Sequence, residues 1–190
     1  RALFRSRGLS LQPVPVRDGL LSMDILERSG ARLVYVSPSH QFPTGTVMPA
    51  GMRYDLLHWA GDHDGMIVED DYDSELRYYG RPVPALQGMD KAGRVIYMGA
   101  LSKVLPPFVR LSYMVLPPPL LGRYRQSRAL FRQGASVLEQ CVLAEYIRSG
   151  ELARQVRRLR KDYQEKGEIM ERFLVKAFGD RIRASRIVSG

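Results

Sequence analysis

The sequence has little that would support redox, metal or membrane chemistry. It contains 1 cysteine in 190 residues, so no internal disulfide can form, and no zinc-ligand spacing is present. Its apolar runs are shorter than the ~18 residues that a membrane-spanning helix needs. The first residues, RALFRSRGLS, lack the apolar core of a secretory leader. We therefore expect a soluble, cytoplasmic protein without a membrane segment and without a bound metal.

The single cysteine, Cys141, lies in a pattern of apolar residues at helical spacing that includes Val137, Leu138, Val142 and Tyr146. A small residue in such a stripe is usually buried against a neighbouring element. We expect Cys141 to be a buried core residue without a chemical role.

A net charge of +9 suggests a nucleic acid partner. Much of the excess lies between Arg154 and Lys166, where Val156, Leu159 and Tyr163 recur at spacings of 3 and 4. This pattern predicts a long amphipathic helix whose charged face is solvated. No helix-turn-helix or basic leucine-zipper pattern accompanies it, so we do not expect this chain itself to bind DNA.

Apolar runs and helical patterns alternate along the chain, which is typical of an α/β sheet. We expect strands at residues 32–37, 66–69, 94–98 and 111–116, and helices at 19–30, 50–63 and from 120 onward, including a long one at 151–178. The segment 11–16 contains two prolines and is at most a short edge strand. With 45% hydrophobic residues, the chain can bury one substantial core.

Polar side chains concentrate in three loops that follow predicted strands: SPSHQFPTG at 37–45, EDDYDSE at 69–75 and GALSKVLPPFVR at 99–110. In open α/β sheets, ligands bind at such carboxyl ends. The first loop brings His40, Gln41 and Thr44 to the sheet edge, although a plain turn with incidental polar residues is the alternative.

Asp70, Lys103 and Arg110 are the side chains in these loops with the clearest chemistry. The acidic loop could hold a divalent cation or be an exposed turn, but Asp70 is expected to be buried deepest and to need a partner that offsets its desolvation. A lysine in an apolar segment is costly unless its charge is removed, as imine formation does. Arg110 offers a bidentate donor fork for a phosphate or a carboxylate.

These motifs, in this order, resemble those of the large domain of fold-type I pyridoxal-phosphate (PLP) proteins, the aspartate aminotransferase superfamily. More narrowly, HQFPTG, EDDYDSELRYYGRPVPALQ and VIYMGALSK are similar to the aminotransferase-like effector domain of the MocR/GabR group of GntR-family transcription regulators. The resemblance covers residues 1–178. It implies a three-layer α/β sandwich with a mostly parallel central sheet.

The resemblance also implies a role for each site residue, with pyridoxal 5'-phosphate as the cofactor. Lys103 would form the internal aldimine, Asp70 would pair with the protonated pyridine nitrogen, and Tyr72 would donate a hydrogen bond to the phenolic oxygen of the ring. It assigns Ser102 and Arg110 to the phosphate, and His40 and Gln41 to the neighbourhood of the ring or the ligand. For His40 and Gln41, a hydrogen bond that only orders the loop is the alternative.

Three residues depart from the family pattern. Phe42 stands where many catalytic aminotransferases have Asn before Pro-Thr-Gly, which removes one hydrogen bond to the cofactor and favours the regulator group. Ala100 replaces a common Ser or Thr and so removes a hydroxyl from the phosphate site. Phe108 replaces a Gly, so the segment between Lys103 and Arg110 is expected to have a different shape and to bind the cofactor more weakly.

The resemblance implies the effector-sensing part of a transcription regulator, which binds PLP through Lys103 and an amino acid or amine as the external aldimine. A fragment of a class I/II aminotransferase, with Lys103 as general base, is the alternative. A dimerisation module that has lost the cofactor is a third hypothesis.

The resemblance further implies that the chain is a fragment. Residues 1–178 would be part of the large domain, and 179–190 the start of a truncated small domain. A homodimer is expected, and DNA would be bound only through a winged helix-turn-helix domain outside this sequence.

Overall fold

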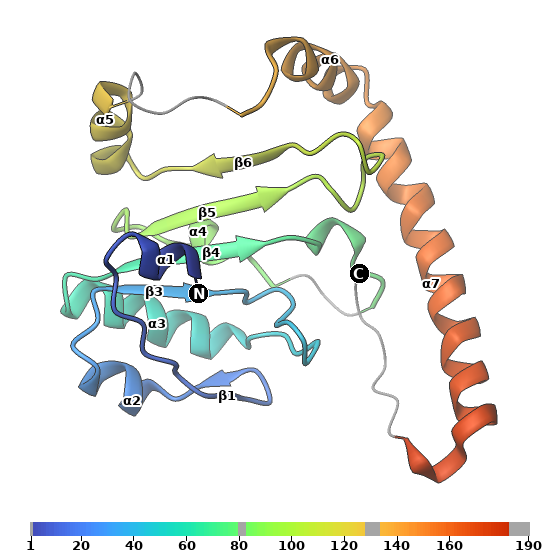
Figure 1. Ribbon diagram of the computed structural model, residues 1–190, viewed down its shortest axis with the longest axis horizontal. Helices are drawn as coiled ribbons and strands as arrows, with labels where there is room; N and C mark the ends of the chain where they lie inside the picture. The colour runs from blue at the N-terminus through green and yellow to red at the C-terminus, as the bar shows by residue number, and fades with distance from the viewer. Residues whose placement is uncertain (1, 80–82, 128–133, 183–190) are drawn as a thin grey trace.

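The computed structural model describes residues 2–79, 83–127 and 134–182. Its centre is a sheet with the strand order β3-β4-β5-β6 (Figure 1), formed by Leu33–Val36, Met66–Asp71, Val95–Ala100 and Ser112–Val115. The first three strands run parallel, and β6 is antiparallel to β5. The predicted α/β fold with a mostly parallel sheet is confirmed, and the observed strand ends lie within two residues of the predicted ones.

One face of the sheet forms the main core. Val34, Ile67 and Val95 are register partners on neighbouring strands, so their side chains lie on the same face. The helices α2 (Met23–Arg28) and α3 (Ala50–Asp62) cover this face and contribute the buried Leu26, Leu56 and Trp59. Burial of such side chains stabilises a fold by about 1.5–3 kcal/mol each. This core therefore holds the strands that carry the site.

The opposite face of the sheet is more exposed. The short helix α1 (Ala2–Ser6) lies over it (Figure 1), and the ring of Phe4 packs edge-on against Tyr35 with 6.1 Å between centroids. Leu33 and Tyr35 are two residues apart on β3 and so share this face, and the strand register places Met98 of β5 on it as well. All three side chains remain exposed. Asp70 lies on the same face, because it is paired with Met98.

A hairpin precedes α2, where the sequence predicted helix. β1 (Val16–Arg17) and β2 (Leu20–Leu21) pair through Asp18 and Gly19, whose φ angles are 51° and 80°. Positive φ at both loop positions is the signature of a tight two-residue turn, for which Asp-Gly is a favoured pair. The helix that was predicted to begin at residue 19 begins instead at Met23. Of the predicted strand 11–16, only Val16 belongs to a strand.

A second core cluster lies at the carboxyl ends of the parallel strands. It contains the buried Leu76, Leu101, Val104 and Leu111, against which partly buried residues of α6 (Val137–Arg148) and α7 (Glu151–Phe178) pack. The remaining short elements are the 3-10 helix η1 (Ser74–Leu76), α4 (Leu86–Met89), α5 (Pro118–Ser127) and the 3-10 helix η3 (Gly179–Arg181). As Figure 1 shows, α7 passes this end of the sheet.

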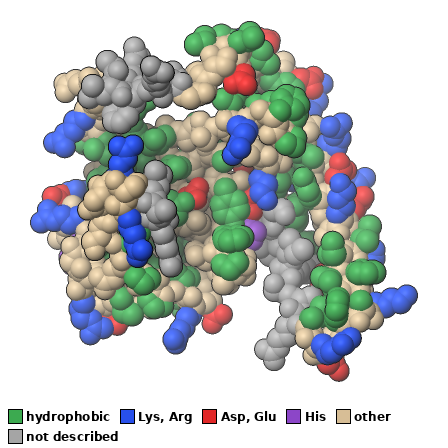
Figure 2. All heavy atoms as spheres, in the orientation of Figure 1, with side chains coloured by type: hydrophobic (Ala, Val, Ile, Leu, Met, Phe, Trp, Pro, Cys, Tyr) green, Lys and Arg blue, Asp and Glu red, His purple; other side chains and the backbone are tan. Residues whose placement is uncertain are grey.

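The long helix predicted at 151–178 is confirmed as α7. Its first half packs on the second core cluster through Leu152, Val156 and Leu159. Apolar side chains gather on the surface of its second half (Figure 2), where Ile169, Met170 and Phe173 are each more than half exposed.

The prediction that Cys141 is buried was wrong. It is exposed on α6, and so are Val137, Leu138 and Val142 beside it. The helix instead turns Leu143 toward the second core cluster. The apolar pattern therefore indicated the helix correctly but not which of its faces is packed.

The helix α7 ends at Phe178, the residue after which the sequence predicts a second domain. Most of the segment predicted to begin that small domain, residues 183–190, lies outside the described residues. Among the helices of the described ranges, none has the length and apolar content that crossing a bilayer requires.

Candidate functional site

The predicted site residues lie around the carboxyl ends of the parallel strands. Asp70 is the last residue but one of β4, while Lys103 and Arg110 lie in the segment that connects β5 to β6. The amide of Leu101 donates to the carbonyl of Leu111 at 3.0 Å and so closes this segment into a loop. Because β6 is antiparallel, Arg110 precedes it at the same edge of the sheet where β4 and β5 end.

The acidic residues of β4 alternate between the two faces of the sheet. Glu69, Asp71 and Asp73 are buried, at 0%, 5% and 1% exposure. Asp70 is only half-buried, so the prediction that it is the most deeply buried was wrong. The reason is the two-residue period of an extended chain, which turns Asp70 away from its acidic neighbours.

Asp70 has one hydrogen-bond partner on its own face. The hydroxyl of Tyr35 on β3 donates to its Oδ2 atom, whereas its Oδ1 atom accepts no hydrogen bond from the described residues. Burial, followed by the hydrogen bond and the negative charge of Asp70, raises the pKa of Tyr35. Tyr35 therefore stays a donor at ordinary pH, and it orients the carboxylate while leaving one oxygen open.

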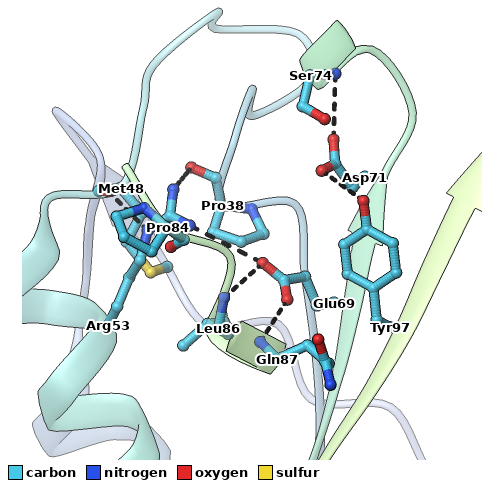
Figure 3. A network of polar contacts seen from close by, with 10 residues as sticks. All are labelled: Pro38, Met48, Arg53, Glu69, Asp71, Ser74, Pro84, Leu86, Gln87 and Tyr97. Atoms are coloured by element: carbon cyan, nitrogen blue, oxygen red, sulfur yellow. Dashed lines mark hydrogen bonds and ion pairs between the residues drawn. The ribbon is translucent and has the colours of Figure 1, made fainter. Parts of the chain in front are cut away.

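Glu69, on the other face, belongs to a buried polar network (Figure 3). It accepts backbone hydrogen bonds from Leu86 and Gln87 at the start of α4, both at 2.9 Å. The guanidinium of Arg53 on α3 lies 3.8 Å from its Oε1 atom. Burial raises the pKa of Glu69 and lowers that of Arg53, and in each case the partner charge works against the effect of burial.

Asp71, at the end of β4, binds the middle of β5 and the start of η1. Its Oδ2 atom accepts from the hydroxyl of Tyr97 at 2.8 Å and its Oδ1 atom from the amide of Ser74 at 3.2 Å, as Figure 3 shows. Burial and the charge of Asp71 raise the pKa of Tyr97. The ring of Tyr97 in turn contacts that of Tyr113 on β6, with 6.0 Å between centroids.

His40 is ordered by the loop that follows β4. Its Nδ1 atom lies 2.5 Å from Oδ2 of Asp73, and its ring stacks on that of Tyr72 at 5.9 Å. The hydroxyl of Tyr72 donates to the carbonyl of His40 at 2.8 Å. Burial and nearby carboxylates, Asp73 foremost, raise the pKa of Tyr72 to about 12. The structure thus brings His40, Tyr72 and Asp73 together.

Gln41 closes the turn of the first loop through its backbone. Its amide donates to the carbonyl of Thr46 at 2.9 Å, and its carbonyl accepts from the amide of Gly45 at 2.7 Å. Gly45 has a φ of 71°, and a Cβ atom there would lie 3.3 Å from Nε2 of His40. A glycine is therefore favoured at this position both by its backbone angle and by the closeness of the imidazole.

Ser102, Lys103 and Arg110 are exposed, although Lys103 belongs to an otherwise apolar segment of the sequence. Their neighbours Leu101, Val104 and Leu111 bury their side chains in the second core cluster, and the loop turns its polar residues outward. Within the described ranges, no hydrogen bond or ion pair involves the side chain of Lys103 or Arg110, and none joins either of them to Asp70.

Two of the three departures from the family pattern are exposed aromatic residues. Phe42 and Phe108 are 78% and 80% exposed, and Ala100 ends β5. Neither aromatic ring contributes to the core, so both are available to the surface around the loops. In the parts of the chain that the structure describes, no group of three or more His, Cys, Asp or Glu side chains is arranged to hold a metal ion.

Sequence reasoning missed the partners that hold the site, namely Tyr35, Arg53, Glu69, Asp71 and Tyr97. One signal was available for Arg53, which is spaced three residues before Leu56 on the apolar face of a predicted helix. A charged residue at such a position needs buried partners. The period of β4 was a second signal, because it separates Glu69 and Asp71 from Asp70.

The fold has close relatives among aminotransferases. It is similar to LysN, an α-aminoadipate aminotransferase from Thermus thermophilus complexed with N-(5'-phosphopyridoxyl)-L-leucine, with a TM-score of 0.86 and 29% identity, covering 98% of this chain and 50% of that chain. No protein-family model matches the chain. The strand order, together with this likeness, defines an aminotransferase-like large domain of fold type I.

The sequence relatives are transcription regulators. The chain is 42% identical over 183 residues to the uncharacterized HTH-type transcriptional regulator YdeL of Bacillus subtilis (strain 168), covering 96% of this chain and 40% of the relative. It is 44% identical over 165 residues to the probable rhizopine catabolism regulatory protein MocR of Rhizobium meliloti, covering 86% of this chain and 33% of the relative. The chain therefore belongs to the MocR-type group of GntR-family regulators, and it spans less than half the length of these relatives.

Proposed function

We propose that this chain is the effector-sensing part of a transcription regulator and that it binds pyridoxal 5'-phosphate. The observation that carries the proposal is the edge at which β4 and β5 end. There, Asp70 keeps one carboxylate oxygen without a hydrogen bond from the described residues. In the neighbouring loop, Lys103 and Arg110 are exposed, and neither side chain has a hydrogen bond or ion pair with a described residue. An acid, an amine and a guanidinium at one edge match the three polar parts of this cofactor.

The residues present fit the group as follows. Asp70 would pair with the pyridine nitrogen, Lys103 would supply the amine that bonds the cofactor covalently, and Arg110 with Ser102 would bind the phosphate. Bound PLP supplies an aldehyde that reacts with amines and a ring that accepts electrons. Tyr72 and His40 already hold each other by a hydrogen bond and a ring contact, which preorganises the loop beside Asp70.

The regulator hypothesis also assigns an effector and partners. An amino acid or an amine would compete with the Lys103 amine, and its binding would be coupled to DNA binding by a winged helix-turn-helix domain of the intact protein. A homodimer is proposed, because fold-type I sites take groups from a second subunit. The names of the relatives support the DNA-binding role, since both are regulators.

A fragment of an aminotransferase is the second candidate. In that case, Lys103 would also move a proton of the substrate as general base. The likeness to LysN favours this function, but its 29% identity is lower than the 42% identity to YdeL. The exposed Phe42, in place of the asparagine of many catalytic members, further favours the regulator.

A titration with PLP tests the proposal. The wild-type protein should develop a visible absorption band, and borohydride reduction followed by peptide mass spectrometry should place the adduct on Lys103. Lys103→Ala should lose both signals, whereas Lys91→Ala, at another exposed lysine, should keep them. Equal spectra for wild type and Lys103→Ala would show that no specific site exists. Sustained keto-acid formation from added amino acids would favour the enzyme over the sensor.

A further inference from the structure

Arg53 is a fully buried arginine that binds both ends of one site loop. Its exposed fraction is 0%, and its guanidinium donates to the carbonyls of Pro38 at 2.9 Å and of Met48 at 3.2 Å. These two residues also bind each other, because the amide of Met48 donates to the carbonyl of Pro38 at 2.9 Å. Between them lies the loop that carries His40 and Gln41. Arg53 thus fixes the distance across the base of this loop (Figure 3).

The same guanidinium connects the loop to β4. Its Nη1 atom donates to the carbonyl of Pro84 at 2.9 Å and lies 3.8 Å from Oε1 of Glu69. Glu69 is equally buried and accepts two amides at the start of α4. Glu69 directly precedes Asp70, so the network ends one residue away from the carboxylate of the site.

Stability alone is a poor explanation for this arrangement. Burying a charge pair costs about as much as its attraction returns, and apolar residues of similar volume often serve a core equally well or better. A planar guanidinium, however, fixes several acceptors in one geometry, which an apolar side chain or a lysine ammonium does not. The distinctive contribution of Arg53 is therefore geometric.

We propose that Arg53 and Glu69 are positioning residues that couple the 38–48 loop to the end of β4, so that His40, Gln41 and Asp70 face a ligand in one fixed arrangement. The identity of that ligand rests on the proposed function above. The coupling itself does not, since it concerns the free protein. Neither residue is a catalytic residue, because both are buried behind the surface that carries the ligand groups.

Hydrogen exchange of the free protein tests the coupling. Arg53→Lys keeps a positive charge near Glu69 but loses the fork that spans the Pro38 and Met48 carbonyls. The amides of Gln41, Gly45 and Met48, which are hydrogen-bonded inside the loop, should exchange about tenfold faster, as expected when one hydrogen bond of ordinary strength is lost. The amide of Leu101, in the other core cluster, should keep its wild-type rate.

A double variant separates positioning from folding. The double variant Arg53→Met with Glu69→Met removes both charges together, so the fold should be retained. The loop should nevertheless lose the hydrogen bonds that Arg53 donates to the Pro38 and Met48 carbonyls. Arg28→Met, which breaks an exposed ion pair on α2, is the matched control and should leave loop exchange unchanged. In the variants of Arg53, the dissociation constant for PLP should also rise by about tenfold or more.

The results distinguish this proposal from the proposed function. If the loop amides of Arg53→Lys exchange as slowly as those of the wild type, the proposed coupling is overturned, whether or not the double variant folds. Faster exchange at Leu101 to the same degree as at Met48 would also overturn it, because the effect would then be general destabilisation. If the wild type takes up no PLP, the proposed function fails, while the exchange rates still decide the coupling.

Discussion

Gly99 lies in β5 against the side chain of Tyr113 on the antiparallel neighbour β6, and replacing it with alanine should test how the edge of the sheet is packed. A Cβ atom at position 99 would lie within 3.0 Å of the Cζ, Cε1 and hydroxyl oxygen atoms of Tyr113. Contacts this short essentially never occur in folded proteins, so either the backbone of β5 or the side chain of Tyr113 must move. The atoms concerned are at the far end of a side chain that is 44% exposed, so the ring of Tyr113 can swing outward.

The loss of stability in Gly99→Ala follows from the contacts that the ring of Tyr113 gives up when it moves. Tyr113 packs against Tyr97, and an aromatic pair of this kind contributes ~0.5–1.5 kcal/mol beyond the area it buries. A side chain displaced from its preferred rotamer costs a further ~0.5–1.5 kcal/mol. We therefore expect Gly99→Ala to lower the free energy of unfolding by about 1–3 kcal/mol. For a domain of this size, each kcal/mol lowers Tm by roughly 2–4 °C.

Urea unfolding of a double-mutant cycle measures this effect. Gly99→Ala should be destabilising in the wild type but nearly neutral in a Tyr113→Ala background, where the clashing ring is gone. Gly61→Ala is a matched control, because a Cβ atom at that helical position meets nothing within 4 Å. Equal destabilisation by Gly99→Ala in both backgrounds would refute the steric argument, since the cost would then come from the backbone of β5.

Three further predictions concern the site itself. Tyr35→Phe removes the donor to Asp70 and should weaken PLP binding several-fold while leaving the unfolding transition in place, as absorbance titration and urea unfolding can show. Arg110→Met should raise the PLP dissociation constant by about 10- to 100-fold, as the loss of a charge-assisted hydrogen bond of ~1.5–3 kcal/mol implies, whereas Arg123→Met, at an exposed arginine of α5, should not. Burial raises the pKa of Glu69, so folding favours the protonated form of this side chain. The stability that this provides is present below the ordinary pKa of 4.5 and is lost as the pH rises through the raised pKa of the folded protein. Urea midpoints measured across this range should therefore fall less steeply with pH in Glu69→Gln than in the wild type; identical slopes would show that Glu69 does not titrate as described.

Much of the sheet could be predicted because its strands are short apolar runs bounded by loops. Residues 33–36 and 95–100 have this form, and α7 was predictable from the spacing of its apolar residues. The β1–β2 hairpin was missed because two-residue strands have too few positions to show a period. The orientation of α6 was missed for a related reason, since a helical stripe indicates a packed face only if a neighbouring element covers it.

The placement of the candidate residues near the strand ends could be predicted, but their contacts could not. His40 and Lys103 lie in the loops that follow β3 and β5, and Asp70 lies near the end of β4. The carboxyl-end rule places all three at one edge of the sheet. The partners are different, because they come from elsewhere in the chain. Tyr35 is 35 residues from Asp70 and Arg53 is 31 residues from Pro84, and only the register of the sheet and the packing of α3 bring them together.

The alternation along β4 explains how one acidic stretch provides both support and a site. Glu69, Asp71 and Asp73 point into the protein, where each carboxylate has a specific donor: backbone amides, Tyr97 or His40. These contacts tie β4 to α4 and β5, and the loop after β4 to the loop after β3. Asp70 points the other way and is held only by Tyr35 among the described residues. Because the three buried acids are already engaged in hydrogen bonds, the stretch is better suited to hold one half-buried carboxylate rigidly than to gather four around a cation.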